Sequence, residues 1–214
     1  GDIMNFQMAS EMMTGASETV LTNDDVAVED SSFTTGRRGV AATIIVEKIV
    51  GSFAETGGNL KECKILGDKV NRNSGSMGVA FSSCTVPAAG KPTFKLGSDE
   101  MEFGVGIHGE PGRRRDKVQP AQEITNELLG AIIEDLKPED NDEILLFING
   151  MGGTPLTELY LLYDNAKKTL DNKNIMVSRS LVGNYCTSLE MQGASITLTK
   201  LDQELKKYWD SPVH

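Results

Sequence analysis

The feature of this 214-residue sequence that most constrains its fold is an apolar run, Glu143–Asn149. A run in which polar and apolar residues do not alternate is typical of a strand buried on both faces, inside a sheet that helices cover. A glycine-rich turn at 150–155 follows the run, and apolar residues then recur at helical spacing over 156–170. This succession of strand, turn and helix predicts an α/β fold.

Periodicity and turn residues place the remaining elements. Helices are predicted at 5–13, 40–53, 60–73, 119–136, 156–170 and 205–209. Strands are predicted at 18–22, 77–83, 94–96, 101–107, 143–149, 175–182 and 194–201. Some strands follow one another directly, so we expect layers of helices that flank one or more mixed β-sheets. If the chain forms two α/β lobes, the boundary falls near 57–59 or 111–120, where glycine and proline interrupt the pattern.

Charge and cysteine content narrow the class of protein. A net charge of −10 argues against nucleic acid or an anionic membrane as the main partner. No apolar run approaches the length of a bilayer span, and no signal peptide is recognisable. Cys63, Cys84 and Cys186 are widely spaced, which indicates reduced thiols in the cytoplasm and neither a disulfide framework nor a metal site. The basic cluster 113–115 is expected to be a solvated loop.

The segment 101–112 reads as a short strand that ends in a glycine-rich loop carrying His108, one of two histidines. A neutral imidazole there can act as a ligand, a base or a nucleophile. Residues 104–109 also match the dinucleotide fingerprint, but that motif needs a helix to follow at once, and Glu110, Pro111 and Gly112 indicate a turn. From the residues alone, a tight turn with a surface histidine is the favoured interpretation.

Three other places leave alternatives open. Asp2 either follows a strand end, where ligands bind in α/β folds, or caps the next helix, and the cap is favoured. The turn at 150–155 either holds an anion on free amides or is merely tight, with neither favoured. Arg37 and Arg38 either bind a phosphate or, as favoured, pair with acidic residues. Those acidic residues are Asp24, Asp25, Glu29 and Asp30.

Residues 100–112, Glu-Met-Glu-Phe-Gly-Val-Gly-Ile-His-Gly-Glu-Pro-Gly, resemble the signature of dihydroxyacetone kinase, in its dihydroxyacetone-binding subunit or domain. Six further blocks agree and come in the family order, so the resemblance runs over essentially the whole sequence. They are Gly-Asp-Ile-Met-Asn-Phe (1–6), Asn-Asp-Asp-Val-Ala-Val (23–28), Thr-Gly-Arg-Arg-Gly-Val-Ala (35–41), Cys-Thr-Val-Pro (84–87), Asn-Gly-Met-Gly-Gly-Thr-Pro (149–155) and Tyr-Cys-Thr-Ser-Leu (185–189).

The resemblance implies the fold of the family's K-domain and an unusual chemistry. In the family, the histidine that matches His108 attacks the ketone carbonyl and forms a covalent hemiaminal. The aspartate that matches Asp2 binds the substrate hydroxyl and is assigned as general base, so the resemblance reverses the preference for a cap. A minor role is expected for Glu110, whose charge would tune the imidazole of His108. Glycerol has no carbonyl, so the chemistry itself would exclude it.

The sequence also departs from the family pattern. The family's upstream Gly-Ser-Gly-His-Glu-Pro loop, with a second active-site histidine, and a lysine before the Gly-Asp motif are not in this sequence. Residues 1–214 therefore resemble the C-terminal part of the dihydroxyacetone-binding (DhaK) domain, and we expect this part to be inactive by itself.

The resemblance further implies partners. The expected function is to bind dihydroxyacetone, in the cytoplasm, for phosphorylation in glycerol metabolism. No cofactor is expected on this chain; ADP or ATP with Mg²⁺ belongs to a separate kinase subunit (DhaL-like) or domain, with either ATP or a phosphotransferase-system protein as donor. A homodimer is expected. The alternative is a catalytically silent relative that senses dihydroxyacetone and binds a transcription regulator; a structural domain without a ligand is a third interpretation. The preferred short ketose or aldose stays open.

Overall fold

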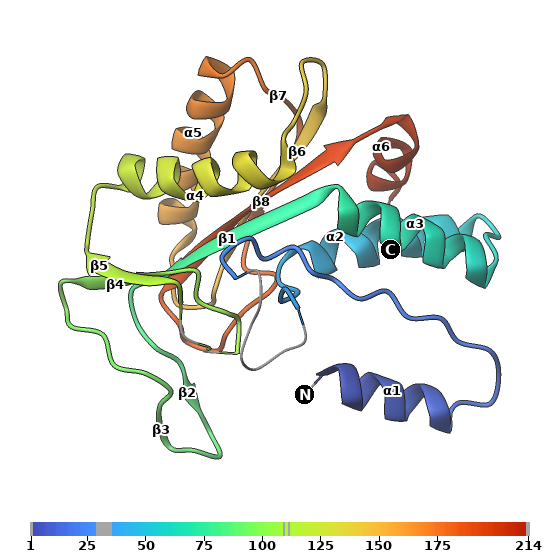
Figure 1. Cartoon of the computed structure of the whole chain (residues 1–214), viewed down its shortest axis with the longest axis horizontal. Helices are drawn as coiled ribbons and strands as arrows, with labels where there is room; N and C mark the ends of the chain where they lie inside the picture. Colours follow the sequence, from blue (N-terminus) through green and yellow to red (C-terminus); the bar gives the residue numbers. More distant parts are fainter. Residues whose placement is uncertain (1, 29–35, 109, 111, 213–214) are drawn as a thin grey trace.

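The computed structural model describes residues 2–28, 36–108, 110 and 112–212, and a six-stranded sheet forms its centre (Figure 1). The strands of this sheet run in the order β5-β4-β1-β8-β6-β7. They are β1 (Ser74–Ala80), β4 (Glu100–Phe103), β5 (Arg114–Lys117), β6 (Glu143–Gly150), β7 (Met176–Gly183) and β8 (Gly193–Leu201). Only β6 and β7 are parallel, and the other neighbours are antiparallel, so the predicted mixed α/β sheet is confirmed.

Helices cover both faces of this sheet. They are α1 (Asp2–Met12), α2 (Ala42–Glu55), α3 (Leu60–Arg72), α4 (Ala121–Leu136), α5 (Leu156–Asn172) and α6 (Gln203–Trp209). Figure 1 shows α4 and α5 together on one side and α2, α3 and α6 on the other, while α1 stands apart. A small hairpin of β2 (Thr85–Val86) and β3 (Lys91–Pro92) projects below the sheet.

Strand β6 shows why the apolar run predicted a covered sheet. Ile144, Leu146 and Ile148 belong to a cluster that includes residues of α4 and α5. Leu145 and Phe147 point the other way, into a cluster formed with α2, α3 and α6. Successive side chains of a strand alternate between faces, so a strand with helices on both sides needs apolar residues at every position.

The segment before α2 is fastened to the sheet through Asp24, which is fully buried. Its Oδ1 atom accepts a hydrogen bond from the amide of Val40 (2.9 Å), and its Oδ2 atom accepts one from the amide of Ala42 (3.0 Å). The hydroxyl of Ser76, on β1, donates to the same Oδ2 atom. Burial raises the pKa of Asp24, although these hydrogen bonds act to lower it. Asp24 thus satisfies amides at the start of α2 from a distant point in the sequence.

The predicted strand at 18–22 is wrong. Residues 18–22 pair with no strand among the described residues. Near its end, the segment forms hydrogen bonds with a side chain where a strand would form them with a neighbouring strand. The side-chain amide of Asn71, on α3, donates from Nδ2 to the carbonyl of Leu21 and accepts at Oδ1 from the backbone amide of Asn23. The chain meets the sheet at Asp24 and Asp25: the amide of Ser76 donates to the carbonyl of Asp24, and Asp25 forms an isolated bridge with Ser76.

Three other local predictions are corrected. The strand expected at 101–107 ends at Phe103, because the chain turns at Gly104 with a positive φ of 74°. The segment 94–96 is not a strand. The basic cluster 113–115 is mostly strand: Arg114 and Arg115 lie on β5 and pair with β4. Their side chains are exposed as expected, but Arg114 lies 5.1 Å from the ring centre of Phe103 and so covers apolar surface.

The helices follow the predicted ranges to within a few residues, and α1 begins three residues early, so that Asp2 lies in its first turn. None of the helices in the described part of the chain has the length and apolar character that a membrane span requires. A division into two lobes near 57–59 or 111–120 stays a prediction.

Replacement of Asp24 tests the fastening of α2. In Asp24→Ala, two buried amides lose their acceptor, and each unsatisfied buried donor costs about 1–3 kcal/mol, so we expect the free energy of unfolding to fall by about 3 kcal/mol or more. The matched control is Asp202→Ala, which removes the acceptor of the Leu205 amide at the half-exposed start of α6 and should cost about 1 kcal/mol. Urea denaturation of both variants checks this, and equal losses would contradict the assigned role of Asp24.

Candidate active site

The loop that carries His108 begins where β4 ends, at Gly104. The amide of Gly104 donates to the carbonyl of Gly78 on β1 (2.7 Å), which keeps the start of the loop against the sheet. A Cβ atom on Gly104 would lie 2.5 Å from the Cβ atom of Ala27, and its φ of 74° is one that other residues rarely adopt. Only glycine therefore fits the turn that directs the loop away from β4.

Two carboxylates face the imidazole of His108. The Nδ1 atom lies 3.2 Å from Oε1 of Glu110, and the Nε2 atom lies 3.3 Å from Oδ2 of Asp2. The other carboxylate oxygen of Glu110 accepts a hydrogen bond from the backbone amide of His108 (3.1 Å), so Glu110 contacts both the ring and the backbone of His108. The structure brings together the two predicted site residues, 106 positions apart, at the junction of the loop with the start of α1.

The surroundings of His108 alter its protonation. Its hydrogen bond with Glu110 raises the pKa of the imidazole, and the nearby charges of Glu110 and Asp2 add to this, while partial burial acts in the opposite direction. Glu110 shows the complementary change: partial burial opposes it, but the hydrogen bonds with His108 lower the pKa of the carboxyl. An ionised carboxylate can only accept, so a neutral imidazole donates Nδ1–H to Glu110 and carries its lone pair on Nε2.

This geometry argues against the dinucleotide interpretation of the glycine loop. No helix opens after residue 104, as the dinucleotide fingerprint requires, since the next regular element among the described residues is β5. The imidazole is 59% exposed, as a surface histidine would be, but its two ring nitrogens are both directed at carboxylates. In the neutral ring, the lone pair on Nε2 lies beside the carboxyl group of Asp2, and this exposed nitrogen is the candidate for nucleophilic or base chemistry.

The two neighbouring arginines have different partners. Arg38 is buried and binds Asp25, with its Nε atom 2.8 Å from Oδ2, so this part of the favoured pairing is confirmed. Arg37 forms a forked pair with Asp135 on α4, at 2.7 and 2.9 Å, and its expected pairing with the acidic segment stays a prediction. Glu29 and Asp30 lie outside the described residues.

The glycine turn at 150–155 is a tight turn and does not offer free amides. The amide of Met151 donates to the carbonyl of Gly193, and that of Gly153 donates to Met191. The amide of Gly152 donates to the side chain of Asn184 (3.2 Å). Protein acceptors occupy the amides of residues 151–153, which favours the alternative of a merely tight turn.

The cysteines provide no reactive centre beside His108. Cys84 is buried in a small cluster with Val105 and Met151. Burial raises the pKa of the Cys186 thiol to about 11, so it carries little of the thiolate that a nucleophile needs. Within the described residues, no group of three or more histidine, cysteine, aspartate or glutamate side chains is placed to hold a metal ion.

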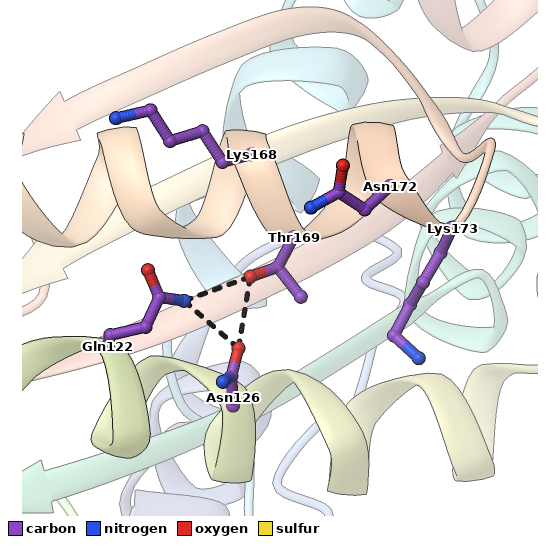
Figure 2. A pocket seen from close by; sticks show the side chains of 6 residues that line it. All are labelled: Gln122, Asn126, Lys168, Thr169, Asn172 and Lys173. Atoms are coloured by element: carbon purple, nitrogen blue, oxygen red, sulfur yellow. Dashed lines mark hydrogen bonds between the residues drawn. The ribbon is translucent and has the colours of Figure 1, made fainter.

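A hollow lies elsewhere on the described part of the chain, between α4 and α5 (Figure 2). Its volume is about 540 Å³, and Figure 2 shows that Gln122, Asn126 and Thr169 bond to one another there. These polar groups satisfy each other, and none of the predicted site residues lines the hollow. It does not compete with the His108 loop as the reactive centre.

Sequence reasoning gave too little weight to two features of this site. Glu110 stands two residues after His108, a spacing that allows contact in a tight turn. For Arg38, the sequence favours pairing with acidic residues over binding a phosphate, and neither alternative includes the hydrogen bond that Arg38 donates to the carbonyl of Gly104 (2.6 Å). The glycines around His108 were the only available sign that the loop passes close to other groups.

Comparisons with known proteins show the family. Residues 1–214 match a family model described as the Dak1 domain. The sequence is 47% identical over 207 residues to the dihydroxyacetone-binding subunit DhaK of PTS-dependent dihydroxyacetone kinase 1 from Listeria innocua. That alignment covers 95% of this chain and 63% of the Listeria protein, so the chain spans less than two thirds of the relative's length.

Solved structures give the same picture. The dihydroxyacetone kinase operon co-activator Dha-DhaQ superposes with a TM-score of 0.83 at 34% identity, over 90% of this chain and 60% of that one. The dihydroxyacetone kinase from C. freundii, solved in complex with AMP-PNP and Mg²⁺, superposes with a TM-score of 0.83 at 29% identity, over 100% of this chain and 39% of that one. The expected K-domain type of fold is therefore confirmed.

Removal of the Glu110 charge tests the electrostatics of the site. In Glu110→Gln the main cause of the raised His108 pKa is lost, so this pKa should fall towards its ordinary value of 6.5. The protonated fraction at neutral pH then decreases, and the midpoint moves to lower pH. Titration by ¹H–¹⁵N NMR of the imidazole measures the midpoint. The control is Glu100→Gln, whose carboxylate pairs with Arg115. An unchanged midpoint in Glu110→Gln, or an equal shift in the control, would contradict the assignment.

Proposed function

Because the chain belongs to the Dak1 domain family, we propose that it binds dihydroxyacetone by a covalent bond between the ketone carbon and Nε2 of His108, and presents it for phosphorylation. The relative from Listeria innocua is named as the dihydroxyacetone-binding subunit of such a kinase. The observation that carries the proposal is the placement of the imidazole between Glu110 and Asp2.

Glu110 prepares the ring for attack. It fixes the ring orientation through Nδ1 and the backbone position through the amide of His108. Held in this way, the neutral ring directs the lone pair of Nε2 outward, on the side where Asp2 lies. A nucleophile whose lone pair is already aimed has less entropy to lose when the substrate arrives.

The bond-forming step balances within this site. Nε2 forms a bond to the carbonyl carbon, and the π electrons of the C=O bond move to oxygen, which takes up a proton from solvent. The ring is left with a positive charge, which is neutralised when Nδ1 gives its proton to Glu110, the acceptor already in contact with it, and Glu110 then releases that proton to solvent. The net change is the addition of N–H across C=O. No redox partner takes part, and the product is a hemiaminal.

Asp2 has a second role, in the transfer of the phosphoryl group. Its Oδ2 atom lies 3.3 Å from Nε2 before substrate arrives, so a substrate carbon attached to that nitrogen brings its terminal hydroxyl within reach of the carboxylate. A carboxylate in this place can orient the hydroxyl and accept its proton as it attacks phosphorus. Asp2 is 64% exposed, which leaves space for a phosphoryl donor to approach.

The phosphoryl donor would come from another subunit or domain. When that partner is bound, ATP with Mg²⁺ would supply the phosphoryl group, or bound ADP would carry it after rephosphorylation by a phosphotransferase-system protein. In the described chain, neither glycine-rich turn has the form of a phosphate cradle, since the first is followed by no helix and the second has its amides occupied. The part played by this chain is therefore to bind and orient the sugar. Its selectivity for ketones over glycerol follows from the chemistry of the adduct.

The two site residues are expected to fail in different ways. His108→Ala removes the nucleophile, so the affinity for dihydroxyacetone should fall by at least about a hundredfold, or roughly 3 kcal/mol. Asp2→Asn keeps the nucleophile, so the sugar should still bind while phosphorylation falls by about 10²–10⁴-fold. Calorimetry measures the binding. Formation of dihydroxyacetone phosphate, with the nucleotide-binding subunit and its donor added, measures the turnover.

The matched control is His214→Ala, which removes the only other histidine and should change neither quantity. Normal binding in His108→Ala would overturn the proposal. If the unmutated protein binds dihydroxyacetone but gives no product with a competent partner, the alternative function holds. The protein is then a catalytically silent sensor, as the similarity to an operon co-activator would suggest.

A further inference from the structure

We propose that Arg38 is a positioning residue for this chemistry: anchored by Asp25, it holds the carbonyl of Gly104 and so fixes where the His108 imidazole stands. The inference rests on the proposed function, because the position of the ring matters to activity only if His108 reacts. Its basis is the set of contacts of Arg38, which join the buried core to the base of the loop.

Arg38 is 6% exposed, and its guanidinium makes a fork between two acceptors. Nη2 donates to the carbonyl of Gly104 at 2.6 Å, while Nε donates to Oδ2 of Asp25 at 2.8 Å. A guanidinium is planar and presents several donors in fixed directions, so holding one acceptor fixes the place of the other. A lysine at this position has a single nitrogen on a flexible stem and cannot define that geometry in the same way.

Asp25 is itself held by the sheet, which makes it a firm anchor. It is 2% exposed and bridges to Ser76 of β1. Its Oδ1 atom accepts the amide of Ala27 at 3.0 Å, leaving Oδ2 for Arg38. The line of contacts thus runs from β1 through Asp25 and Arg38 to Gly104, four residues before His108.

The inner side of the loop is packed at Val105, which is 2% exposed and clusters with Cys84 and Met151. A small cavity of about 10 Å³, bordered by Val105, Ile107 and Asp25, lies beneath the loop and has room for about one water molecule. The peptide groups of Gly104 are held by hydrogen bonds in addition to this packing: its amide donates to Gly78, and its carbonyl accepts from Arg38.

Arg38 also lies beside the group that holds the ring. A Cβ atom on Gly106 would stand 3.0 Å from Nη1 of Arg38 and 2.1 Å from Oε2 of Glu110. The guanidinium and the carboxylate therefore both approach the same glycine, and Glu110 in turn grips His108. A shift of Arg38 would therefore displace the loop both at its base, Gly104, and near its middle, at Gly106 and Glu110.

The experiment compares two conservative substitutions in the same motif. Arg38→Lys keeps the charge but loses the fork, whereas the control, Arg37→Lys, changes a forked pair with Asp135 at the surface. We expect Arg38→Lys to weaken dihydroxyacetone binding by at least about tenfold and Arg37→Lys to leave it within twofold. Calorimetry at pH 8 measures both, well above the pKa of Asp25, which burial raises to about 6 against the influence of Arg38.

A second measurement needs no substrate. The ring nitrogens of His108 are observed by ¹⁵N NMR in a His214→Gln background, where His108 is the only histidine. Arg38→Lys should move or broaden these signals, and Arg37→Lys should not. A role in stability alone would lower the melting temperature but leave the ring signals and the affinity, measured well below the transition, as they were.

The outcomes separate this inference from the proposed function. If the unmutated protein binds dihydroxyacetone and Arg38→Lys changes neither affinity nor ring signals, the positioning role is overturned and the proposed function stands. If the unmutated protein binds no dihydroxyacetone, the proposed function fails, and the ring signals alone decide whether Arg38 positions the imidazole. If Arg38→Lys does not fold, Asp25→Asn replaces it in both measurements, with the same expectations and the same overturning result.

Discussion

Two adjacent aspartates, Asp24 and Asp25, join the parts of this molecule on which the site depends. Asp24 binds amides at the start of α2 and the hydroxyl of Ser76 on β1, while Asp25 binds Arg38. Buried carboxylates are costly unless they are fully hydrogen-bonded or paired, and both of these are. This cost favours one position of residues 24 and 25 on the sheet, because a shift of these residues would leave a buried carboxylate without its hydrogen-bond partners. The helical layer, the sheet and the loop base at Gly104 are therefore fixed relative to one another.

The candidate site combines this rigid base with exposed reacting groups. The buried contacts end at Gly104, whereas His108 is 59% exposed and Asp2 comes from the first turn of a helix that stands apart from the sheet (Figure 1). Glu110 links the buried base of the loop to the exposed imidazole, since its own side chain is partly buried and it contacts the ring at Nδ1. A nucleophile must be accessible and also aimed, and here accessibility comes from the loop while aim comes from the groups beneath it.

The sequence was sufficient for the architecture because the apolar run of β6 admits few alternatives to a sheet covered on both faces. It also singled out His108 and Asp2, but only the resemblance favoured a function for Asp2. It failed where a tertiary contact replaced a local one. The side-chain amide of Asn71 bonds to residues 21 and 23 in place of a partner strand, and the guanidinium of Arg114 lies over the ring of Phe103, in a basic cluster that forms a strand. Local periodicity does not reveal either contact. It also does not reveal the contact of Arg37 with Asp135, 98 residues away on α4.

The central claim is a bond between carbon and nitrogen, and NMR can observe that bond directly. Dihydroxyacetone labelled with ¹³C at the carbonyl is mixed with protein that carries ¹⁵N-labelled histidine. The account predicts a bound tetrahedral carbon with a one-bond coupling to a ring nitrogen, lost in His108→Ala and kept in His214→Ala. A bound molecule whose labelled carbon retains the ketone shift and shows no such coupling would contradict it.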